Sequence, residues 1–169
     1  MLPSVHALLQ ELDAETPATR RVLERIPADR LGWRPHTKSM SAGQLAQHVA
    51  SIPGTIARVV LQDGLDLSGR AMTYAECASP EAMLATFEES IATLRDTLRS
   101  FDDETAVAPW RLHVGDRDIF SLPRIGVLRT MCFNHWYHHR GELVVYLRLL
   151  DIPVPVVYGR SADENPFAA

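Results

Sequence analysis

The 169-residue sequence has few cysteines and no long hydrophobic run, and both shortages narrow what the protein can be. Its two cysteines, Cys77 and Cys132, are far apart and form no CxxC pair, so neither a disulfide framework nor covalent haem attachment is predicted. No apolar run approaches the roughly 20 residues of a membrane-spanning helix, because Arg148 interrupts the most apolar late stretch. The first residues also lack the pattern of a signal peptide. We therefore expect no membrane partner and a cytoplasmic location.

Clusters of basic residues are also missing. The chain has 17 Lys and Arg against 21 Asp and Glu, which gives a net charge of −4 with histidine counted neutral. A nucleic-acid-binding protein normally carries a basic stripe or patch. We therefore expect no nucleic-acid partner.

The composition is that of an ordinary globular protein, with 46% hydrophobic and 22% charged residues. A chain of this length buries roughly 70% of the surface that its extended form would expose. We expect one domain over residues 1–169.

Helical periodicity dominates the sequence, with apolar residues recurring at steps of three and four. Ser41 and Gln44 predict a capping box, and Ser79 followed by Pro80 predicts a second helix start. Pro53 should kink the helix that contains it. The predicted helices cover about 4–25, 41–62, 80–101 and 122–150.

The connections between these helices predict their order. About 17 residues separate the second and third helices, and an extended link of that length can reach roughly 55 Å, enough to cross a bundle. The second and third helices can therefore run parallel. Alternating residues on both sides of Gly115-Asp116 predict a short β-hairpin near 110–120. We predict an all-α fold, a four-helix bundle with a long crossover and this hairpin.

Three of the seven histidines lie on predicted core stripes. His48 lies between Leu45 and Ile52, while His135 and His139 are one turn apart on the last helix. An unpaired buried polar group costs about 1–3 kcal/mol, so three imidazoles in one core require a polar partner. A divalent cation is such a partner, and three protein ligands with one open position are typical of catalytic zinc sites. The sequence predicts a metal site formed by His48, His135 and His139.

Several alternatives for this site stay open at the sequence level. His138 is a rival ligand to His139, and Cys132 is either a soft extra ligand or an inert core thiol. Non-covalent haem also remains open, whereas Trp136 stands where a zinc protease of the HExxH type needs glutamate. Glu142 shares the histidine face, where we consider it as a catalytic proton shuttle or as a partner of a ligand ring.

Two parts of the sequence resemble the DinB/YfiT-like superfamily of metal-dependent enzymes. One is the helix start Met40–Val49, and the other runs through Asn134–Glu142 and Tyr146–Arg148 to the tail segments 153–155 and 158–164. Many relatives have glutamine where Glu142 stands. The resemblance implies a four-helix bundle in up-down-down-up order and a metal held by the same three histidines. It also implies homodimers and, in some members, transferases or isomerases that use low-molecular-weight thiols.

Two functions are carried forward. The first is a metal-dependent enzyme, a thiol-dependent transferase or a hydrolase, which acts on a small-molecule substrate. Its ion, with zinc or nickel favoured, would lower the pKa of a bound water or thiol to give a nucleophile near neutral pH. The second is a non-catalytic metal-binding or stress-response interaction domain. An open coordination position beside a cleft would favour the enzyme, and a closed site would favour the structural role.

Overall fold

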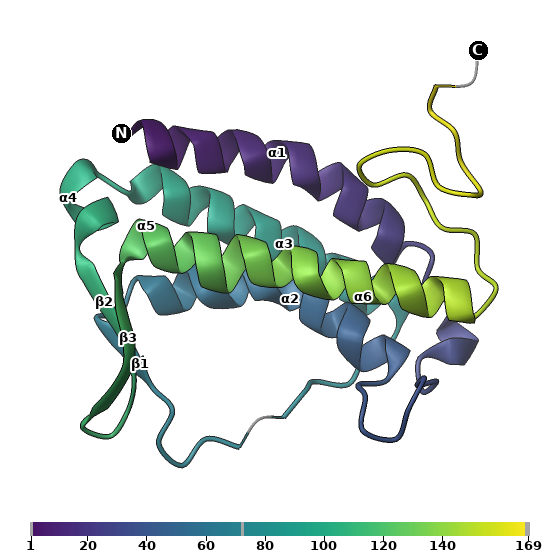
Figure 1. Cartoon of the computed structure of the whole chain (residues 1–169), viewed down its shortest axis with the longest axis horizontal. Helices are drawn as coiled ribbons and strands as arrows, with labels where there is room; N and C mark the ends of the chain where they lie inside the picture. Colours follow the sequence, from purple (N-terminus) through teal and green to yellow (C-terminus); the bar gives the residue numbers. More distant parts are fainter. Residues whose placement is uncertain (1, 72, 168–169) are drawn as a thin grey trace.

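Four long helical segments run through the computed structural model, which describes residues 2–71 and 73–167 (Figure 1). Two of them, α2 and α3, run in one direction, and α1 and α6 run in the opposite direction (Figure 1). Helix α1 contacts α3 and α6, and α2 contacts the same two helices. The segments are α1 (Pro3–Leu23), α2 (Ala42–Val60), α3 (Pro80–Ser100) and a composite of α5 (Arg124–Val127), the π-helical η2 (Leu128–Asn134) and α6 (His135–Leu149).

A small sheet and two short helical pieces complete the architecture. The protein is mostly helical, and its three-stranded sheet is larger than the hairpin that the all-α prediction allowed. The predicted hairpin is confirmed, and Gly115 adopts a φ of 55° at its turn. A strand from the long link pairs in parallel with this hairpin, which the sequence analysis did not predict. The additional elements are η1 (Ala28–Arg30), β1 (Gly64–Asp66), α4 (Asp103–Val107), β2 (Pro109–Val114) and β3 (Arg117–Pro123).

Side-chain caps start α2 and α3 at the predicted residues. Ser41 Oγ accepts a hydrogen bond from the Gln44 backbone N–H at 3.1 Å, and Gln44 Oε1 accepts one from the Ser41 N–H at 3.0 Å. Ser79 caps α3 through the N–H of Ala82 at 3.2 Å. Each interaction satisfies a backbone donor that has no partner inside the helix.

Helices α2 and α3 approach each other closely at Gly54, one residue after Pro53, through which α2 continues. The Gly54 N–H donates to Ser90 Oγ at 2.6 Å, and a Cβ at this position would lie 2.9 Å from the Ser90 Cα. The chain therefore needs glycine here, and this contact fixes the depth at which α2 sits against α3.

The last helix differs from the prediction because of its π-helical stretch. The predicted core stripe passed through His135, His139 and Leu149, yet Leu149 is 57% exposed and Trp136 is fully buried. A π-helix has more residues per turn than an α-helix, so the buried line advances by one position after Cys132. The two histidines consequently lie beside the core stripe instead of at its centre.

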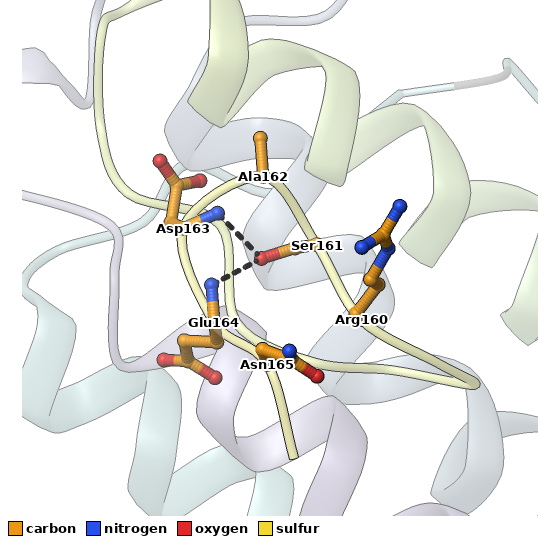
Figure 2. Close-up of a pocket in the computed structure, with 6 residues that line it drawn as sticks. All are labelled: Arg160, Ser161, Ala162, Asp163, Glu164 and Asn165. Carbon is orange, nitrogen blue, oxygen red and sulfur yellow. Dashed lines mark hydrogen bonds between the residues drawn. The ribbon is translucent and has the colours of Figure 1, made fainter. Parts of the chain in front are cut away.

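The C-terminal tail folds back as a turn around Ser161, which Figure 2 shows in close-up. Ser161 Oγ accepts hydrogen bonds from the backbone N–H groups of Asp163 at 3.1 Å and Glu164 at 2.9 Å. Asp163 then pairs with Arg148 of α6 at 2.5 Å, and Glu164 pairs with Arg25 after α1 at 2.7 Å. The turn thus fastens the tail to the ends of two helices.

A fully buried charge joins the same two helices. Arg140 of α6 is 2% exposed and donates to Glu15 Oε2 at 2.6 Å and to Thr19 Oγ1 at 2.9 Å, both on α1. Its second Nη donates to the Tyr158 hydroxyl. Arg140 and Arg148 therefore both tie α6 to other parts of the same chain.

Candidate metal centre

The structure brings His48, His135 and His139 together from two helices. His48 comes from the second turn of α2, and the other two occupy the first and second turns of α6. All three are partly buried, and one nitrogen of each lies within 4.8 Å of the others. The three histidines that the sequence analysis placed on two separate helices thus form one cluster.

The facing atoms of this cluster are the Nε2 nitrogens. His135 Nε2 lies 2.9 Å from His139 Nε2 and 3.3 Å from His48 Nε2. Two nitrogens bound to one tetrahedral ion at 2.0–2.1 Å would lie about 3.3 Å apart. The separation of His135 from His48 equals this spacing, and that of His135 from His139 is 0.4 Å shorter.

The other ring nitrogens show which Nε2 atoms lack a proton. His135 Nδ1 lies 3.2 Å from the Met131 carbonyl oxygen, which can only accept, so Nδ1 carries the proton. His139 Nδ1 lies 2.6 Å from Glu142 Oε2 and by the same argument donates to this carboxylate. With the ring proton on Nδ1, each of the two rings presents an Nε2 lone pair toward the other. Two lone pairs at this distance repel, and a cation bound between them would remove this repulsion.

Burial also favours the neutral form of His48 and of His135. Loss of solvation, followed by the nearby His139 and His135, lowers the pKa of His48 to about 4. Burial, followed by His139, likewise lowers the pKa of His135. Neutral imidazole is the form that coordinates a metal ion.

Glu142 contacts both His139, a member of the triad of His48, His135 and His139, and His138, the alternative ligand. One carboxylate oxygen contacts His139 Nδ1, and Oε1 lies 3.3 Å from His138 Nε2. His138 is 63% exposed and lies on the far side of Glu142, whereas His139 is 13% exposed. The geometry therefore favours His139 as the third member of the triad, and Glu142 is in the position of a carboxylate that orients a ligand ring.

A cleft of about 400 Å³ opens beside the triad. His139, Glu142 and Tyr146 contribute to it from α6, and the turn between α1 and α2 contributes residues 34 and 37–40. Gln44 and Tyr74 complete the lining. A volume of this size suits a small molecule.

The sequence analysis missed most of the residues that line this cleft. Arg34, Lys38 and Tyr74 lie in connecting segments without helical or strand periodicity. Only Lys38 carried a detectable signal, because it is the single lysine of the sequence.

Other candidates from the sequence lie outside the centre. Cys132 is fully buried, and burial raises the pKa of its thiol, as expected for an inert core thiol. Among the described residues it belongs neither to the three-histidine cluster nor to the second group of potential metal ligands, which is His138, His139 and Glu142. Trp110 and Trp136 are core residues, and Tyr137 donates to Glu11 at 2.7 Å. Unlike Trp110, Trp136 and Tyr137, Tyr146 lines the cleft. His6 and His36 are exposed, and His113 is partly buried near the hairpin turn.

Fold and site together define a mostly helical protein with a three-histidine cluster that could hold a metal ion. The model of the DinB family matches residues 1–166, and the chain belongs to this family. It is similar to the uncharacterised protein YrdA of Bacillus subtilis, with 20% identity over 164 residues, 97% of this chain and 93% of that protein.

Two crystal structures show the same fold. A DinB-like protein from Bacillus cereus superposes with a TM-score of 0.68 at 21% identity, covering 89% of this chain and 95% of that one. A DinB-like protein from Bacillus subtilis superposes with a TM-score of 0.67 at 18% identity, covering 91% and 99%. Within the described residues, no helix is both long and apolar enough to cross a membrane.

Proposed function

We propose that the protein is a metal-dependent enzyme in which His48, His135 and His139 hold one divalent ion, zinc or nickel, through their Nε2 atoms. One observation carries the proposal: the Nε2 atoms of three histidines from two helices converge, while Nδ1 of His135 and Nδ1 of His139 each face an acceptor oxygen. The four-helix bundle in up-down-down-up order would be the frame that holds α2 and α6 at this spacing.

The chemistry would be transfer to or from a small-molecule thiol, or hydrolysis. The ion would supply Lewis acidity and so provide a nucleophile near neutral pH. Glu142 would orient the His139 ring through Nδ1, and its Oε1 could hold a proton at the edge of the cleft. Tyr146 and Tyr74 would help to exclude water from the reacting groups.

The cleft favours this enzyme over a non-catalytic metal-binding or stress-response domain. A structural zinc site is closed by four protein ligands, whereas a catalytic site keeps an open position. Here three histidines converge, and His139 also lines a cleft of about 400 Å³. A small-molecule substrate fits this arrangement. The homodimer and the cytoplasmic location stay predictions.

Elemental analysis of the purified protein tests the metal site. We expect about one ion per chain in the wild type and in His138→Ala, and loss of the ion in His135→Ala. His6→Ala, an exposed histidine on α1, is the matched control and should keep the metal. Absence of metal from the wild type after incubation with zinc and with nickel would overturn the proposal.

Turnover then distinguishes the two functions. We expect the metal-loaded wild type to act on thiol-transfer or hydrolytic substrates and the chelator-treated protein to lose that activity. Full metal content with no activity across a broad panel would favour the non-catalytic domain.

A further inference from the structure

The rim of the cleft beside the triad carries two cations without counter-ions. Arg34 and Lys38 both line the cleft, both are exposed, and neither forms an ion pair within residues 2–71 and 73–167. Some arginines of the helices are paired, as Arg20 is with Glu24 and Arg58 with Glu89, whereas Arg21 of α1 is exposed and donates to the Val156 carbonyl oxygen. The cleft is therefore a place where positive charge stays available to a ligand.

The nearby carboxylates form no ion pair with these two cations in the described residues. Glu142 lines the cleft, but its oxygens contact the rings of His138 and His139. Glu76 accepts a hydrogen bond from Gln44 Nε2 at 2.6 Å. Two cations against the one carboxylate of Glu142 leave the lining with a net charge of +1, histidine counted neutral, so the cleft attracts anions in a chain whose net charge is −4.

The composition of the chain distinguishes Lys38 from its other cationic residues. Lys38 is the only lysine in the sequence, and every other basic residue is an arginine. The lysine and Arg34 come from the same turn, which faces His139 and Glu142 across the cleft. An ammonium and a guanidinium together provide several N–H donors for one oxyanion.

We propose that Arg34 and Lys38 bind the oxyanion group, a carboxylate or a phosphate, of the small molecule that the enzyme uses. The inference rests on the proposed function, in which the other end of the substrate reaches the histidine triad. The two cations fix one end of the molecule, and its reactive end is thereby held next to the candidate metal centre. Neutral analogues of the substrate would lose this orientation.

The test measures the rate at which Lys38 is acetylated. Peptide mass spectrometry can follow this rate directly, because the sequence contains a single lysine. The rate is measured on full-length protein stripped of metal by a chelator, so that the result does not depend on metal loading. The probes are succinate and glycerol 3-phosphate, compared with succinamide, glycerol and sodium chloride at equal ionic strength. The metal content of the untreated samples is measured in parallel, which separates failure of this inference from failure of the proposed function.

We expect one or both anions, at a few times their dissociation constants, to slow acetylation of Lys38 about threefold or more, while the neutral probes and chloride do not. Arg34→Gln should abolish this protection. Arg117→Gln removes an exposed arginine from the distant hairpin and should leave the protection unchanged. Protection by succinate alone indicates a carboxylate, and protection by glycerol 3-phosphate alone indicates a phosphate.

Three results would overturn the inference. The first is acetylation that neither anion slows more than chloride does. The second is full protection in Arg34→Gln, since the guanidinium would then have no part in binding. The third is equal loss in Arg117→Gln, which would show a general effect of charge and no specific site.

Discussion

Replacing Glu142 with glutamine and with alanine should weaken metal binding by two different amounts. The carboxylate accepts a hydrogen bond from His139 Nδ1 at 2.6 Å, which fixes the ring and leaves its Nε2 directed at the other two histidines. Glutamine keeps an acceptor oxygen but loses the charge. Alanine loses both.

The magnitudes follow from the strength of this hydrogen bond. Hydrogen bonds to charged groups contribute about 1.5–3 kcal/mol, and neutral ones about 0.5–1.5 kcal/mol. Glu142 is 43% exposed, so solvent screens the interaction and the lower ends of both ranges apply. The difference of about 1 kcal/mol predicts a five- to tenfold weaker site in Glu142→Gln. Loss of a partner of this kind typically costs 10- to 100-fold, which we expect in Glu142→Ala.

A competition titration against a chromogenic zinc chelator measures these affinities. Glu76→Gln is the matched control, because Glu76 contacts Gln44 and no triad histidine, and its affinity should equal that of the wild type. Wild-type affinity in Glu142→Ala would refute the reasoning, since the carboxylate would then have no influence on His139. Equal losses in the two Glu142 variants would show that the hydrogen-bond acceptor, which glutamine retains, contributes nothing.

Three further predictions concern stability. Arg140→Met should cost about 3–5 kcal/mol in urea unfolding because it leaves Glu15 nearly buried without its partner, and adding Glu15→Leu should restore most of the loss. Gly141→Ala should stabilise the protein by about 1 kcal/mol, since no atom lies within 4 Å of the added methyl group. The hydrogen bond from Arg129 lowers the pKa of Glu11, so stability present at neutral pH is lost as the pH falls below 4.5 and through the folded-state pKa.

Each of these has a clear contrary outcome. An Arg140→Met variant that loses less than about 1 kcal/mol would show that water already solvates Glu15. Destabilisation by Gly141→Ala would mean that a second copy of the chain packs on this face of α6, as the predicted homodimer allows. The acid dependence of unfolding should flatten in Glu11→Gln, and an unchanged pH profile would assign it to other carboxylates.

Local rules of the sequence predicted the helix starts and the hairpin. Ser41 and Ser79 cap their helices through interactions that span only three residues, and Gly115 occupies a turn that its neighbours define. The stripe on α3, from Met83 to Phe101, is buried as expected, because regular α-helical spacing continues along that element. Such features need no knowledge of the rest of the chain.

Longer-range features escaped prediction for physical reasons. The strand β1 forms only because β2 offers it an unpaired edge, and the sequence of the link contains no strand periodicity. Arg34 and Lys38 meet α6 through the tertiary fold alone. The triad was predictable because each histidine lies next to a core stripe, although the expected position of His135 at the centre of the stripe was wrong.

The π-helical stretch also bears on how relatives of this chain are compared. A π-helical turn accommodates one more residue than an α-helical turn, so deleting one residue within 128–134 would restore a regular helix. That deletion would leave the helix on either side in its present orientation, because the wider turn is what accommodates the extra residue. A relative with a regular helix here should therefore show a one-residue gap in this stretch, while its histidines align. Gap placement in this stretch, more than overall identity, would show which family members share the same histidine geometry.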